Sequence, residues 1–223
     1  MSVVKIEDYQ VSDTFLVGGI LSLSGGFQDA YTYVLRDNVF ANAQTGNIVL
    51  MALSLMLGQF ARGVRYLLPV IAFVCGIIVS EQISHRYKHS HKLHWRQIVL
   101  CIEILFLTLV AFIPGTLNVL ANVLVSFTCA MQVQSFRKVR GYTYASTMCI
   151  GNLRSGTESL SVFFRNKDKA SFVKAMHYYG IIFMFAIGAG VGGILSSLLG
   201  IRSILISSAL LVIAFILMMK KRF

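Results

Sequence analysis

The chain has 223 residues, of which 56% are hydrophobic and only 13% are charged, and its net charge is +11 at pH 7. A soluble domain carries about a quarter charged residues, so this composition excludes the soluble globular class. The basic residues lie at the ends of apolar runs, which is a pattern of membrane topology and not of a nucleic-acid surface. We therefore expect an all-α polytopic membrane protein that contacts the lipid bilayer and has no nucleic-acid partner.

Six apolar stretches are each long enough to cross a hydrocarbon core of about 30 Å as a helix. They are residues 13–36, 64–86, 95–113, 116–136, 175–199 and 201–219. Two further segments, 38–58 and 141–164, are apolar but are interrupted by polar residues. These two segments either cross the membrane, which gives eight crossings, or enter and return on the same side, which gives six.

The distribution of lysine and arginine favours six crossings. With six crossings and both termini in the cytoplasm, 15 of the 20 lysines and arginines lie on the cytoplasmic side. With eight crossings, the basic residues divide almost evenly between the two sides, which the positive-inside rule disfavours. We therefore predict six transmembrane helices plus two re-entrant helical segments.

The two halves of the chain are weakly similar to each other. One set of residues recurs after 104 positions, namely Gly18, Ser22, Gly26 and Gln28 against Asn122, Ser126, Ala130 and Gln132. The pair Gly46-Asn47 recurs after 105 positions as Gly151-Asn152. This predicts two copies of one unit, residues 1–113 and 114–223, within one membrane domain. Because each copy has three crossings, the second copy must be inverted, and a 3+3 inverted repeat is typical of transporters.

One stretch in the first copy carries a family resemblance. Residues 25–53 read GGFQDAYTYVLRDNVFANAQTGNIVLMAL, with a glycine-rich helix, an Asp-Ala pair, a Val-Phe pair and then Thr-Gly-Asn. This pattern resembles the signature of the YoaK-like family of bacterial integral membrane proteins, a domain of unknown function. The resemblance extends over nearly the whole chain and implies a multi-pass protein of the bacterial cell (inner) membrane. It implies no particular activity.

The first candidate site is Thr45-Gly46-Asn47, inside the polar segment 38–58. A break at Gly46 would give two short helical arms, with Thr45 or Asn47 capping the second arm. The N-terminus of that arm would place free amides and a partial positive charge at membrane depth, which suits an anion, a carboxylate or an ordered water. The alternative is a tight helix crossing, with Asn47 bonded to a neighbouring helix. Gly151 and Asn152 predict the same kind of helix break in the second copy.

Four ionisable residues complete the set of candidate site residues. Arg154 and Glu158 share one helix face and, if they lie deep in the membrane, need partners there. If that segment lies at the inner surface, both are solvated. Asp29 could pair with a basic residue such as Arg36, bind a cation or proton, or cap a helix. Glu103 lies in the middle of an apolar run, so it should be protonated, paired or facing a wet cavity.

The remaining motifs favour structural roles. The four cysteines are predicted to be small buried hydrophobes, and the histidine-rich stretch 85–95 a basic inner loop and not a metal site. Two stripes of small residues, Gly18–Ala30 and Gly188–Gly200, are expected to pack helices closely within one chain or between two copies, so a homo-oligomer stays open. No nucleophile elbow, HExxH, Walker or Rossmann pattern occurs, so we expect no enzyme, no metal and no cofactor.

These observations predict a small-solute transporter or a channel-like permease. Its site would lie at the two Gly-Asn breaks near the bilayer midplane, with Asp29, Arg154 and Glu158 nearby, and its solute would be small and polar or anionic. The main alternative is a membrane scaffold, sensor or assembly factor that transports nothing. A third alternative is a membrane enzyme that acts on a lipid or a quinone, which would need a wet cavity open to one leaflet.

Overall fold

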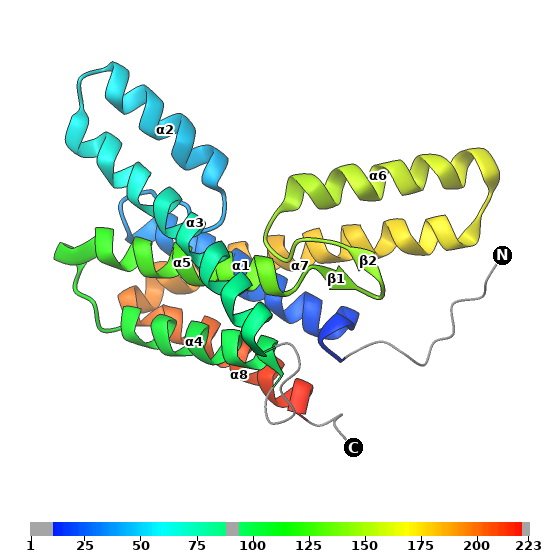
Figure 1. The fold of residues 1–223 in the computed structure, drawn as a ribbon. Helices are drawn as coiled ribbons and strands as arrows, with labels where there is room; N and C mark the ends of the chain where they lie inside the picture. Colours follow the sequence, from blue (N-terminus) through cyan, green and yellow to red (C-terminus); the bar gives the residue numbers. More distant parts are fainter. Residues whose placement is uncertain (1–10, 88–93, 220–223) are drawn as a thin grey trace.

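The computed structural model of the chain describes residues 11–87 and 94–219, and this part folds into eight α-helices and one small β-hairpin (Figure 1). The predicted all-α class is confirmed. The helices and strands are α1 (Phe15–Leu35), α2 (Gln44–Met56), α3 (Phe60–Tyr87), α4 (Trp95–Val110), α5 (Asn118–Ser135), β1 (Lys138–Val139), β2 (Tyr142–Thr143), α6 (Cys149–Asn166), α7 (Lys169–Leu199) and α8 (Ile204–Met219).

The main hydrophobic core lies among α1, α4, α5 and α8. It is made of aliphatic side chains that repeat at helical spacing on the facing sides of these helices, such as Leu21, Leu107, Val125 and Leu211, all with no exposed surface. These side chains interdigitate, and the van der Waals contacts between them hold the four helices together.

Glycines bring two helix pairs into very close contact. A Cβ atom added to Gly188 of α7 would lie 2.0 Å from the carbonyl oxygen of Leu23 in α1, and one added to Gly192 would meet Phe27 at 2.7 Å. A Cβ atom on Gly76 of α3 would lie 2.3 Å from the carbonyl oxygen of Phe127 in α5. The close-packing role predicted for the second glycine stripe is therefore confirmed where α7 crosses α1. Gly76, which belongs to neither predicted stripe, allows the same approach of α3 to α5.

Each of the two polar segments consists of a non-helical stretch followed by one helix. Neither segment forms two helical arms. Helix α2 packs on α3, and α6 packs on α7, as hairpins that extend to different sides of the molecule in Figure 1. The break falls before Gln44 and before Cys149, whereas we predicted it at Gly46 and Gly151, which are the third residues of α2 and α6. The predicted cap by Thr45 or Asn47 was also wrong, because both lie inside α2, whose N-cap residue Ala43 makes no side-chain cap.

Three helical stretches of the described residues are both long and apolar enough to cross a membrane. They are Phe60–Tyr87, Gly115–Ser135 and Lys169–Met219, the last of which contains α7 and α8. Helix α4 has only 16 residues, and α1 includes the polar pair Gln28-Asp29. The expectation of six crossings therefore stays a prediction. The residues 1–10 and 220–223, on which part of the cytoplasmic assignment of the termini rests, lie outside the described residues.

Candidate functional site

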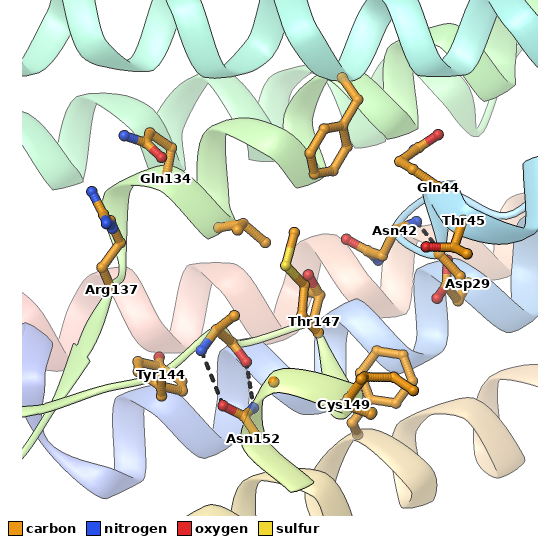
Figure 2. Close-up of a pocket in the computed structure, with 18 of the residues that line it drawn as sticks. Asp29, Asn42, Gln44, Thr45, Gln134, Arg137, Tyr144, Thr147, Cys149 and Asn152 are labelled. Carbon is orange, nitrogen blue, oxygen red and sulfur yellow. Dashed lines mark hydrogen bonds between the residues drawn. The ribbon is translucent and has the colours of Figure 1, made fainter. Parts of the chain in front are cut away.

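A pocket of about 790 Å³ lies where the first turns of α2 and α6 meet α1, α3, α5 and α7 (Figure 2). Its apolar wall includes Phe73, Ile77, Val133 and Phe185. The polar part of the wall comes from the two irregular segments and the helix starts that follow them, and it comprises Asp29, Asn42, Gln44, Thr45, Gln134, Arg137, Thr143, Tyr144, Thr147, Asn152 and Ser155. The volume is within the range of pockets that hold small molecules.

The two asparagines of the Gly-Asn pairs hold the irregular segments in the same way. Asn47 accepts a hydrogen bond from the amide of Phe40 at 3.1 Å and donates one to its carbonyl oxygen at 2.7 Å. Asn152 accepts from the amide of Ala145 at 3.2 Å and donates to its carbonyl oxygen at 2.7 Å. Each asparagine thus satisfies both polar groups of the residue seven positions before it, where the backbone has no regular partner.

Asp29 holds the segment that leads into α2. The amide of Asn42 donates to Oδ1 of Asp29 at 2.7 Å, and the amides of Ala41 and Ala43 also face this carboxyl group. The side-chain amide of Asn42 in turn donates to the carbonyl oxygen of Gly25 at 3.2 Å. Of the roles that the sequence left open for Asp29, the structure shows that of a cap for the backbone just before α2.

Arg36 does not pair with Asp29. Its side chain is fully buried and donates to Tyr31, to Asn118 and to three carbonyl oxygens at the end of α4, at 2.8 to 3.4 Å. The negative end of the α4 dipole and these neutral acceptors stabilise the buried guanidinium. Arg36 therefore ties the end of α1 to the turn between α4 and α5.

Both irregular segments leave polar groups without a partner, and the second one does so at the backbone just before α6. Within residues 11–87 and 94–219, the backbone amides of Thr147 and Met148 have no acceptor. Two pocket residues also have a buried side-chain atom that lacks a partner among the described residues, namely Oγ1 of Thr147 and Oδ1 of Asn42. The hydroxyl of Tyr144 lacks one as well, but it lies against Gly18 of α1. Buried polar groups are rarely left unpaired, so these atoms indicate a ligand or trapped water.

The predicted site residues fall into three groups. Asp29, Thr45, Gly151 and Asn152 line the pocket, and Gly46 and Asn47 lie next to it in the first turn of α2. The other three, Glu103, Arg154 and Glu158, do not line the pocket.

Arg154 and Glu158 do not lie at a buried depth between helices. Both side chains are on the exposed face of α6, they do not line the pocket, and no ion pair joins them in the described part of the chain. This differs from the placement that we expected, because α6 is amphipathic and turns its small residues, such as Gly156, toward α7.

Glu103 lies inside the four-helix core and not at the pocket. Its Oε1 accepts a hydrogen bond from the amide of Gln28 at 3.3 Å, and its Oε2 has no partner among the described residues. Gln28 also bonds to Ser24, Ser207 and Cys129, so it links α1, α5 and α8. A single amide partner for a fully buried carboxyl group favours its neutral form.

The sequence reasoning missed Asn42, Thr147, Tyr144 and Arg137 as pocket residues. A signal for two of them was present, because Thr147 follows Asn42 by 105 positions, as Gly151 follows Gly46. Arg137 was counted only as a topological charge, and the turn that brings Tyr144 into the pocket is set by the β1–β2 hairpin.

The cysteines differ from the prediction. Cys129 is buried, but Cys75 and Cys101 are exposed on the helix surface, and Cys149 is half-buried and lines the pocket. The described residues hold no group of three or more His, Cys, Asp or Glu side chains that could bind a metal. His89 and His91 of the histidine-rich stretch lie outside the described residues.

Comparisons with known proteins agree on a membrane protein without an assigned activity. Residues 17–217 match the family described as "Protein of unknown function (DUF1275)". The chain is 26% identical over 183 residues to the UPF0700 transmembrane protein YoaK of Bacillus subtilis, which covers 76% of this chain and 78% of that protein. No solved structure matches the chain at a significant level.

Proposed function

We propose that this chain, which belongs to the DUF1275 family of proteins of unknown function, is a small-solute transporter or channel-like permease of the bacterial inner membrane. The observation that carries the proposal is the pocket that the first turns of α2 and α6 form together. Helix starts that converge on one cavity, beside unpartnered polar groups, are a common design of solute sites in transporters. The proposal assigns the pocket to binding and passage and not to catalysis.

Pairs of matching contacts support a two-copy architecture, with residues 1–113 and 114–223 as the copies. The contact of Gly76 with Phe127 has a counterpart in that of Gly188 with Leu23. Gly188 follows Gly76 by 112 positions, and Phe127 follows Leu23 by 104. The latter spacing is the one that relates the two halves of the sequence. Helices α1 and α5 run in opposite directions across Figure 1, which supports an inverted relation between the copies. Rocking one copy against the other would open the pocket to each side in turn.

Sided cysteine labelling tests the proposed topology of six crossings with cytoplasmic termini. We would place single cysteines at Gln59, in the exposed turn between α2 and α3, and at Lys167, in the exposed turn between α6 and α7. A membrane-impermeant reagent should reach Gln59→Cys from outside the cell and Lys167→Cys only from the cytoplasmic side. Labelling of both from one side would overturn the inverted arrangement.

Flux into liposomes tests the proposed function itself. Purified protein should move small polar or anionic solutes, and Phe73→Trp, which fills the apolar wall of the pocket, should reduce that flux about tenfold or more. The matched control is Arg154→Gln on the exposed face of α6, which should leave the flux unchanged. If no solute of a broad panel is moved or bound, the protein is not a permease, and a scaffold or sensor role takes its place.

A further inference from the structure

We propose that the pocket binds a monocarboxylate with a small apolar body, and that its carboxylate lies at the start of α6, where the second copy lacks a counterpart of Asp29. This inference rests on the proposed function and names the class of solute. It follows from comparing the two irregular segments group by group.

In the first copy, the acceptor for the backbone amides is part of the protein. The carboxyl group of Asp29 accepts a hydrogen bond from the amide of Asn42 at 2.7 Å, just before α2 begins. It lies at the positive end of the α2 dipole, so its negative charge is favoured there. The anion at the start of α2 is therefore the carboxylate of Asp29 itself.

In the second copy, the corresponding acceptor is missing. The 104-residue spacing of α1 and α5 puts Val133 at the position of Asp29, and the 105-residue spacing of the segments puts Thr147 at the position of Asn42. Val133 lines the pocket, but its side chain accepts no hydrogen bond. Accordingly, the amides of Thr147 and Met148 have no acceptor within the described residues.

The same place holds buried polar side chains that lack partners. Thr147 is 5% exposed, and its Oγ1 has no hydrogen-bond partner in the described structure. Oδ1 of Asn42, which is 3% exposed, has none there either, but it is an acceptor and therefore offers nothing to an anion. The methyl group of Thr147 packs against Gly25, and Figure 2 shows Thr147 on the pocket wall near Asn42. The Thr147 hydroxyl and the free amides are donors, which is the set of groups that an oxyanion needs.

Charge and shape favour a monocarboxylate over other anions. Two charged side chains line the pocket, Asp29 and Arg137. The Asp29 carboxyl group already accepts the amide of Asn42, whereas Arg137 is exposed and has no ion pair within the described part of the chain, so Arg137 is the charge that is left for a ligand. The apolar part of the wall includes Phe73, Ile77, Met148 and Phe185. A single carboxylate on a small apolar body satisfies the donors and fills this wall, whereas a doubly charged phosphate would be poorly solvated against it.

Protection of Cys149 from alkylation tests the inference, because this native thiol lines the pocket. The protein would carry Cys75→Ser and Cys101→Ser, and maleimide modification of Cys149 would be followed by mass spectrometry in a detergent without anionic lipid. Butyrate and benzoate should each slow the modification saturably, about fivefold or more at excess probe. Their neutral amides, butyramide and benzamide, and inorganic phosphate should not.

Substitution of Val133 provides the decisive comparison. Val133→Asp would build the missing carboxylate into the second copy and should abolish protection by both probes, while the thermal stability stays equal or rises. Val133→Asn has the same shape without the charge and should keep most of the protection. Arg137→Gln should weaken binding of both probes about tenfold.

Each outcome has a defined meaning. The inference is overturned if neither carboxylate protects Cys149, if butyramide and benzamide protect equally well, or if Val133→Asp leaves protection intact. If the carboxylates protect as expected but no liposome flux is found, the binding site stands and the permease function fails. If flux of other solutes is found without carboxylate protection, the permease stands and the carboxylate site fails.

Discussion

Asn152 and Ala145 are joined by two hydrogen bonds, and their geometry repeats that of Asn47 and Phe40 in the first half of the chain. Each asparagine, in the first turn of its helix, therefore fixes the residue seven positions earlier, just before that helix begins. The sequence suggests that the Gly-Asn pairs are solute ligands. In the structure, the asparagine of each pair instead binds the amide and carbonyl groups of the backbone before its helix. The pocket depends on these hydrogen bonds because they set the direction in which α2 and α6 begin.

We expect Asn152→Ala to lower the free energy of unfolding by about 2 kcal/mol, because both backbone groups of Ala145 lose their partner. Asn47→Ala should have an effect of the same size. Unfolding by SDS titration would measure both. Thr45→Ala is the control, since this side chain is exposed, and it should change the stability by less than about 0.5 kcal/mol. Equal stability of the Asn152→Ala variant would contradict this role of the asparagine.

Arg36→Gln should lower the free energy of unfolding by about 3 kcal/mol or more, because several buried acceptors at the end of α4 lose a charged donor. The matched control is Arg65→Gln. Arg65 is half exposed and lies 3.8 Å from Asp37, so its loss should cost about 0.5 kcal/mol or less. Thermal unfolding in detergent would compare the two variants. Similar melting temperatures for both would show that the Arg36 contacts do not stabilise the fold.

Gly188→Ala should destabilise the protein by about 1–3 kcal/mol, because its methyl group would collide with the backbone of α1 at Leu23, which a side-chain rotation cannot relieve. Gly190→Ala is the control in the same helix. A Cβ atom there meets nothing within 4 Å, so stability should stay unchanged or rise by up to about 1 kcal/mol. SDS titration of both variants would measure the difference. A destabilised Gly190→Ala variant would mean that lipid contact, and not helix packing, controls these sites.

Asp168 should contribute stability that disappears in acid. It caps α7 by accepting from the amides of Ala170 and Ser171, and bonds from the Ser171 hydroxyl and these amides lower the pKa of its carboxyl group below 3.8. A carboxyl group with a lowered pKa stabilises the fold above its unfolded pKa and loses this effect as the pH falls through its folded pKa. The melting temperature of Asp168→Ala should therefore lie below that of the wild type at pH 7, and the gap should close below pH 3.8. A gap that does not change with pH would contradict the role of the charge.

The pattern of apolar runs was sufficient to predict the helical core. The limits of α1 and α5 follow closely from where apolar residues begin and end, because helix formation in an apolar environment depends on local sequence. Helix α7 begins at Lys169, six residues before the apolar stretch 175–199. The close helix crossings were also predictable, since glycines four residues apart leave room for another backbone. The start of α2 and α6 was not, because Asn47 and Asn152 bind the backbone of a residue seven positions earlier, outside the helix.

The sequence by itself determined that this is an all-α membrane protein and that the pair Gly-Asn occurs twice in it, 105 positions apart. It did so through composition, hydrophobic length and residue spacing, which are properties of the chain and need no contacts. Only the tertiary structure decided which polar residues meet. It separated Glu103, Arg154 and Glu158 from the pocket, and it brought Asn42 and Thr147 into it, because burial and pairing depend on which helix faces pack together and not on the order of residues.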